Sequence, residues 1–133
     1  ECTLEEIQAE ADVISLHTPL TEETKYLLNK NFFNSCKRDI YVINTARGKS
    51  LNTADLVEAL KSGKVKGACL DVLEYEAVSF ENIETDKLPE PFQYLIHSEK
   101  VLLTPHIAGW THESNEKIAL FLANKMAEVL LKR

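Results

Sequence analysis

The chain has 133 residues, of which 44% are hydrophobic and 27% are charged, so it can bury one modest core in a single domain. Twenty-one acidic side chains against fifteen basic ones give a net charge of −6, which repels phosphate backbones and argues against nucleic acid as a partner. No apolar run approaches the roughly 18 residues that a membrane span needs, and residues 1–6 do not resemble a signal peptide. We therefore expect a globular protein with neither nucleic-acid nor membrane partners.

The three cysteines, Cys2, Cys36 and Cys69, lie far apart and show no C-x-x-C spacing. This pattern fits neither a disulfide framework nor a zinc site, so we expect a reducing, cytoplasmic environment and no bound metal. The chain opens without a methionine, and its first one is Met126, which leads us to expect a fragment of a longer protein.

Four short apolar runs predict the strands of one sheet, at residues 13–16, 40–43, 68–70 and 101–103. Apart from Ser15 these runs are continuously apolar, which is typical of parallel strands that are covered on both faces. The intervals at 17–39 and 44–67 are long enough for crossover helices with their loops. The order of elements therefore predicts an α/β fold with a parallel, Rossmann-like sheet.

Two helices have clear sequence signals. Asn52 is a good N-cap for the first, and Gly63 stands where a glycine commonly ends a helix. The second begins near Thr111 and has an apolar stripe, so it could cover the sheet or bridge to another domain. Between them, residues 77–100 combine two prolines with scattered charges, which predicts an irregular loop with about one helical turn.

The segments that follow the four predicted strands are rich in functional side chains. In an open parallel sheet the ligand lies outside the carboxyl ends of the strands, so these segments are the ones to inspect. They are residues 17–19, 44–48, 71–76 and 104–109. If the strands are neighbours, we expect Arg47, Asp71, Glu76 and His106 to point into one crevice.

Each of these residues alone also has an ordinary structural explanation. Arg47 could form a surface ion pair, Glu76 could be a solvated loop carboxylate, and His106 could lie beside the start of a helix. Asp71 could cap a turn, and His17 could pack at a strand end. Their common position at one edge of one sheet favours a functional interpretation.

The chemistry of these side chains narrows the reaction. A histidine beside a carboxylate is favoured in its protonated form, so it can act as a general acid near neutral pH. The planar guanidinium of Arg47 can bind a carboxylate with two hydrogen bonds. No serine or cysteine is evidently placed as a nucleophile. Proton delivery and carboxylate binding on a nucleotide-binding sheet favour hydride transfer to a 2-keto acid.

Four motifs lie in order along the chain: A-D-V-I-S-L-H-T-P-L-T at 11–21, V-I-N-T-A-R-G at 42–48, G-A-C-L-D-V at 67–72 and L-T-P-H-I-A-G at 103–109. Together they resemble the D-isomer-specific 2-hydroxyacid dehydrogenases, in particular phosphoglycerate dehydrogenase-like members. The resemblance implies that residues 1–133 are a partial NAD-binding domain, with the second mononucleotide half of a doubly wound sheet and a C-terminal helix. It also implies that the glycine-rich loop half and the substrate domain are absent from this sequence.

The resemblance implies roles for individual residues. Arg47 would bind the substrate carboxylate and carbonyl, Glu76 would orient and charge the imidazole, and His106 would be the acid/base. The residues implied to contact the cofactor are Thr18, Pro19, Thr45, Ala46, Arg47, Asp71, His106 and Gly109. The sequence departs from the family pattern at Lys49, Ser50, Leu73, Ala77 and Trp110.

We therefore predict an NAD-dependent oxidoreductase, acting as a cytoplasmic homodimer on a small 2-keto or 2-hydroxy acid of the 3-phosphoglycerate or hydroxypyruvate/glyoxylate type. NADP stays open, because the acid that selects between the cofactors lies upstream in this family. The alternative is a non-catalytic NAD-sensing or corepressor-like module of the same fold. The joint presence of Arg47, Glu76 and His106 favours the enzyme, although the 133 residues alone are expected to be inactive.

Overall fold

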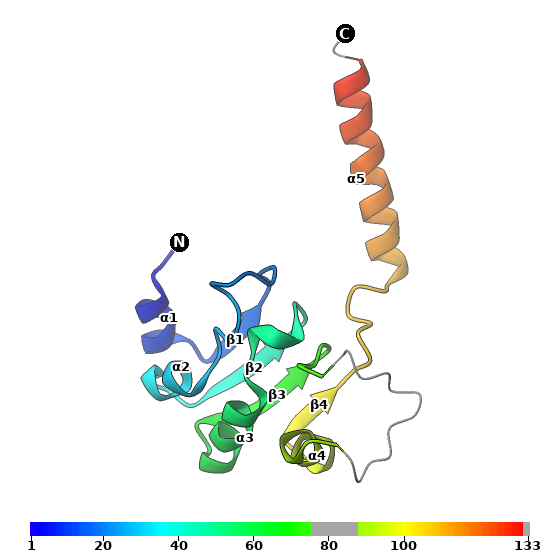
Figure 1. Cartoon of the computed structure of the whole chain (residues 1–133). Helices are drawn as coiled ribbons and strands as arrows, with labels where there is room; N and C mark the ends of the chain where they lie inside the picture. The colour runs from blue at the N-terminus through cyan, green and yellow to red at the C-terminus, as the bar shows by residue number, and fades with distance from the viewer. Residues whose placement is uncertain (76–87, 132–133) are drawn as a thin grey trace.

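A four-stranded parallel sheet forms the centre of the computed structural model, which describes residues 1–75 and 88–131 (Figure 1). The strands lie side by side in chain order as β1 (Val13–Leu16), β2 (Ile40–Asn44), β3 (Val65–Leu70) and β4 (Val101–Leu103). In the register, Leu16 pairs with Asn44, Asn44 with Leu70, and Leu70 with Leu103. The four strands therefore end in line, and the predicted α/β class with a parallel sheet is confirmed.

Two short helices cross over between the first three strands. α2 (Lys30–Ser35) begins after Asn29, whose side chain accepts hydrogen bonds from the next turn, and it buries Phe32 and Phe33. α3 (Thr53–Ser62) begins after Asn52 and ends at Gly63, which adopts the left-handed conformation with φ 85°, as the sequence predicted.

Two further helices were not predicted. α1 (Leu4–Glu10) starts with a capping box in which Thr3 and Glu6 bond reciprocally. For residues 77–100 we expected an irregular loop with about one helical turn. The structure describes residues 88–100 of this segment, and there the expectation is wrong, because α4 (Glu90–His97) has 8 residues. Pro91 stands in the first turn of α4, where its missing N–H costs nothing, so it starts this helix instead of breaking it.

Only one face of the sheet is covered by the described residues. Ile14 and Val42 are buried beneath the helices, whereas Val13 and Tyr41 are 53% and 50% exposed on the opposite face. The expectation of cover on both faces is therefore wrong for this part of the chain. The physical reason is that successive right-handed crossovers, all stepping in one direction across the sheet, place their helices on the same side.

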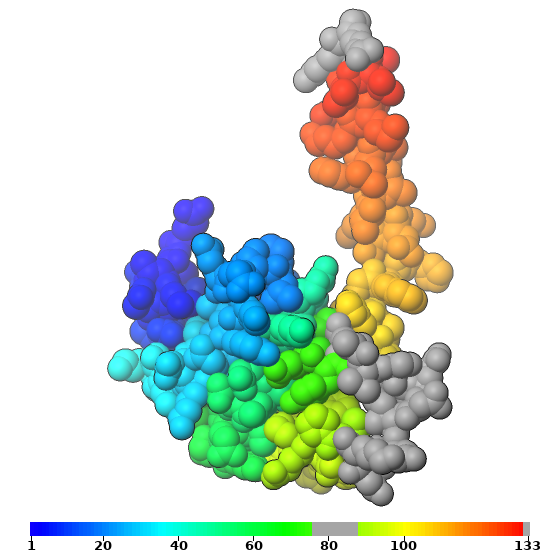
Figure 2. Space-filling view, in the orientation of Figure 1, coloured from blue at the N-terminus to red at the C-terminus, as the bar shows by residue number. Residues whose placement is uncertain are grey.

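α5 (His112–Leu130) begins where the sequence predicted, with Thr111 as its N-cap, and rises away from the sheet (Figures 1 and 2). None of its residues is buried, and Phe121 is 62% exposed. The sequence left open whether this helix covers the sheet or bridges to another domain. In this structure α5 does not cover the sheet. No helix in residues 1–75 or 88–131 combines the length and the apolar character that crossing a membrane requires.

The left-handed end of α3 provides a test of the fold. Gly63→Ala should lower the free energy of unfolding by about 1 kcal/mol, because a β-carbon disfavours positive φ. An added Cβ would meet no atom within 4 Å, so the cost is conformational and not steric. Gly63→Asn should lose less, since asparagine tolerates this conformation better. Urea unfolding measures all three proteins, and an Ala variant as stable as the parent would contradict the assignment.

Candidate active site

The carboxyl edge of the sheet carries all the predicted site residues that the structure describes. Thr18 and Pro19 follow β1, residues 45–47 follow β2, Asp71 follows β3, and residues 106 and 109 follow β4. Because the strands end in line, these segments leave the sheet from one edge. Glu76 lies outside the described residues, so its role stays a prediction.

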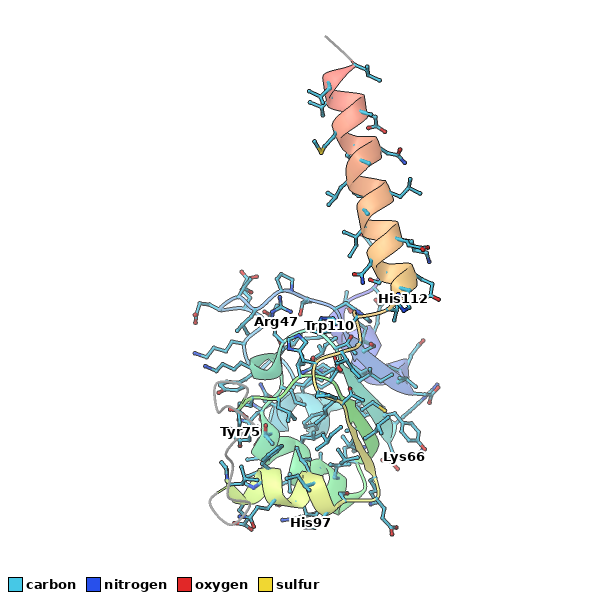
Figure 3. The ribbon with its side chains drawn as sticks, turned by 90° about the vertical axis from the view of Figure 1, so that its right-hand side faces the viewer. Arg47, Lys66, Tyr75, His97, Trp110 and His112 are labelled. Atoms are coloured by element: carbon cyan, nitrogen blue, oxygen red, sulfur yellow. The ribbon has the colours of Figure 1, made fainter. Side chains whose placement is uncertain are left out.

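A buried asparagine shapes the turn that carries Arg47. The side chain of Asn44 is fully buried at the end of β2, where its Oδ1 accepts the Ala46 N–H at 3.1 Å and its Nδ2 donates to the Arg47 carbonyl at 3.0 Å. Arg47 itself is exposed, and its Nη1 donates to the Ala46 carbonyl at 2.6 Å (Figure 3). The turn thus places a guanidinium at the surface of the edge, where an anionic ligand can reach it.

Gly48 brings this turn against the chain that leaves β3. A Cβ at Gly48 would lie 1.9 Å from the Leu73 carbonyl oxygen and 2.7 Å from the Glu74 nitrogen. No side chain fits in that space, so only glycine allows the two backbones to approach this closely. The close approach fixes where Arg47 lies relative to the segment after β3.

A second link joins three loops, and no pattern in the sequence predicts it. The Tyr26 hydroxyl donates to Oε1 of Glu74 at 2.7 Å, and the Thr53 N–H donates to Oε2 of the same carboxylate at 3.0 Å. The hydrogen bond to Glu74, with added effects of burial and charge, raises the pKa of Tyr26. The Tyr26 N–H also donates to the Lys49 carbonyl at 2.8 Å. The loop after β1 is thereby tied to the turn of Arg47 and to the segment after β3.

Asp71 is buried at the end of β3 and is bonded to the loop that carries His106. Its carboxylate accepts the Thr104 hydroxyl at 2.6 Å and the N–H groups of Ile107 and Ala108 at 2.8 and 2.9 Å. Burial alone would raise the pKa of Asp71, but these hydrogen bonds and the nearby His106 outweigh it, so the pKa lies below its ordinary value of 3.8. Asp71 therefore remains an anion at neutral pH.

Two observations test whether a cofactor fits this edge. The hydroxyl oxygen of Thr18 is buried, and it has no hydrogen-bond partner among the described residues. Such an atom is costly unless a ligand or water satisfies it. A Cβ at Gly109 would meet no atom within 4 Å, so the chain leaves open space there. Both features are compatible with a ligand that approaches the predicted contact residues.

The chain matches the family described as D-isomer specific 2-hydroxyacid dehydrogenase, NAD binding domain, over residues 1–108. It is 38% identical over 130 residues to a D-2-hydroxyacid dehydrogenase (NAD(+)) of Clostridioides difficile, covering 96% of this chain and 39% of the relative. It is 41% identical over 111 residues to a D-lactate dehydrogenase of Lactiplantibacillus plantarum, covering 82% and 33%. The crystal structure of D-lactate dehydrogenase with NAD+ from Lactobacillus jensenii superposes with a TM-score of 0.79 at 34% identity, covering 99% of this chain and 41% of that one.

The chain therefore belongs to the D-isomer-specific 2-hydroxyacid dehydrogenase family, within its NAD-binding domain. This confirms the resemblance that the four motifs indicated. The chain spans about two fifths of the length of the Clostridioides difficile relative and of the Lactobacillus jensenii structure.

The close approach at Gly48 can be tested with a matched pair of variants. Gly48→Ala should lower the free energy of unfolding by about 2 kcal/mol or more, because the backbones of two loops must separate to admit the methyl group. Gly109→Ala is the control, since its methyl group meets no atom within 4 Å. Equal stability of the two variants in thermal unfolding would contradict the described packing.

Proposed function

We propose that residues 1–133 form part of the NAD-binding domain of an oxidoreductase that interconverts a 2-keto acid and a D-2-hydroxy acid. The observation that carries the proposal is the placement of Arg47 and His106 at one sheet edge. Buried polar groups support both residues, Asn44 beneath Arg47 and Asp71 beneath the loop of His106. This edge also has the buried, unpaired hydroxyl of Thr18.

In the proposed mechanism Arg47 binds the substrate carboxylate and polarises the neighbouring carbonyl through its guanidinium N–H groups. His106 donates a proton to the carbonyl oxygen during reduction and takes it back during oxidation. Glu76 is the predicted anionic partner that favours the protonated imidazole. NAD, when bound, supplies or accepts the hydride. The residues that would hold it are Thr18, Pro19, Thr45, Ala46, Arg47, Asp71, His106 and Gly109.

We further propose that this chain works within a longer enzyme. In this fold the pyrophosphate binds at a glycine-rich turn and the helix behind it, and no such turn occurs in the sequence. The 133 residues by themselves should therefore bind NADH poorly and be inactive. Tests of catalysis therefore need the complete enzyme, which is the protein of the length usual in this family that contains these residues.

The proposed substrates are small 2-keto acids and their D-2-hydroxy acids. Relatives are named for D-lactate, glyoxylate and aromatic 2-oxoacids, and all of these compounds share the carboxylate that Arg47 would bind. Trp110 is 82% exposed and directly follows Gly109 in the connection after β4, so it is the candidate contact for a substrate side chain. The 3-phosphoglycerate type, a homodimer and a cytoplasmic location remain predictions.

The role of His106 can be tested in the complete enzyme. His106→Gln should lower kcat by about two to four orders of magnitude, because it removes the general acid. Oxidation of NADH with pyruvate, glyoxylate and hydroxypyruvate measures kcat, and the affinity for NADH alone should be nearly unchanged. The control is His97→Gln, because His97 lies on α4, far from Arg47 and Trp110 (Figure 3). A near-normal kcat for His106→Gln would contradict the assignment.

The role of Arg47 predicts a different pattern. Arg47→Lys keeps the charge but loses the planar pair of donors, so KM should rise and kcat should fall. Arg38→Lys is the control, since Arg38 pairs at 3.1 Å with the exposed Asp12 before β1. If Arg47→Lys changes only the melting temperature, Arg47 is structural. If the parent enzyme oxidises NADH with none of the keto acids, the NAD-sensing alternative is favoured.

A further inference from the structure

We infer that Asp71 is a positioning residue for His106: it holds the loop at residues 104–108 in the conformation that presents the imidazole at the sheet edge. The inference rests on the proposed catalytic role of His106. It goes beyond that role because it assigns Asp71 a main task other than contact with the cofactor.

The carboxylate and the main chain of Asp71 both bind this loop. On the main chain, the Asp71 carbonyl accepts the His106 N–H at 2.9 Å, while the Asp71 N–H donates to the Asn44 carbonyl at 3.0 Å. On the side chain, Oδ1 accepts from Thr104 and Ile107, and Oδ2 accepts from Ala108. Asp71 thus forms hydrogen bonds with His106 itself and with residues on both sides of it.

The backbone conformation of His106 explains why an anion is needed there. His106 has φ 56°, in the left-handed region that is unfavourable for a residue with a β-carbon. In this conformation the N–H groups of Ile107 and Ala108 point toward the same carboxylate, an arrangement that binds anions. The hydrogen bonds to the negatively charged Asp71 therefore offset the unfavourable backbone conformation of His106. Without that carboxylate, the loop should leave this conformation.

The burial of Asp71 limits what else its carboxylate can do. Asp71 is 5% exposed, and its two oxygens already accept three hydrogen bonds out of about four that a carboxylate can take. At most one position remains for the predicted contact with NAD. Loss of a cofactor contact would weaken NADH binding, whereas loss of positioning would slow proton transfer. The two roles can therefore be separated by experiment.

The first experiment uses Asp71→Asn in the complete enzyme. An asparagine amide keeps one accepting oxygen but turns an NH2 group toward N–H groups of the loop, so His106 should shift. We expect kcat at saturating NADH to fall by about 10- to 100-fold, the size of loss that a small misplacement causes. The Kd for NADH alone, followed by fluorescence, should change less than about threefold. A Kd that rises more than about tenfold with kcat preserved overturns the inference.

A double variant shows whether the loss passes through His106. When His106 is already Gln, there is no imidazole to position, so adding Asp71→Asn should lower kcat by less than about twofold. If the two substitutions multiply their losses in full, Asp71 acts independently of His106 and the inference is wrong. A general loss of folding would also multiply, so this measurement separates positioning from stability.

A conservative pair at Thr104 keeps the test valid should Asp71→Asn fold poorly. Thr104→Val keeps the shape but removes the hydroxyl that donates to Asp71, so kcat should fall by about three- to tenfold. Thr104→Ser keeps the hydroxyl and should retain most of the activity. Equal kcat values for the Val and Ser variants would overturn the inference.

Hydrogen exchange supplies a readout that does not depend on catalysis. The amides of Ile107 and Ala108 should exchange at least about tenfold faster in Asp71→Asn than in the parent. Unchanged exchange overturns the inference whatever the activity of the parent. If the parent reduces no keto acid but these amides still exchange faster in Asp71→Asn, the proposed function is overturned while the link between Asp71 and the loop stands.

Discussion

Four parallel strands end on one line, and this shared end point determines where every segment of the site begins. Leu16, Asn44, Leu70 and Leu103 lie in register, so each following segment starts from the same line at the edge of the sheet. Hydrogen bonding between parallel strands fixes this register, and a slip by one residue would exchange the buried and exposed faces of a strand. Arg47 and His106 come from segments far apart in sequence, and this register is what gives them a shared neighbourhood.

Buried polar side chains then convert the edge into a defined surface. Asn44 is the last residue of β2, and Asp71 directly follows the adjacent strand β3. The side chain of each accepts hydrogen bonds from backbone N–H groups in a turn beyond the paired strands. Burial makes these hydrogen bonds costly to lose, since a buried donor or acceptor without a partner is penalised more than an exposed one. Glu74 has a similar role between Tyr26 and the start of α3. The precision of the site comes from groups that need not touch a ligand.

The sequence predicts the local features well and the long-range ones poorly. Short-range signals that act over a few positions predicted the strands at 13–16 and 101–103, the N-cap Asn52, the start of α5 near Thr111 and the end of α3 at Gly63. α4 was missed because its prolines were interpreted as breakers, although one of them starts the helix. The bond from Tyr26 to Glu74 spans 48 positions, and no pattern in a single sequence encodes such a pairing. The strand-end segments were predicted to carry the site, but the supporting contacts of Asp71 were not.

Trp110 is the only tryptophan in the sequence, and it is 82% exposed on the same connection between β4 and α5 that carries His106. An indole in water emits at longer wavelength than one that is covered, so this single side chain makes the loop optically visible. Within these 133 residues the indole emission has one source, and no label has to be introduced near the bonds between Asp71 and the loop. Trp110, one of the departures from the family pattern, thus also provides an intrinsic spectroscopic probe of the connection on which the proposed acid/base depends.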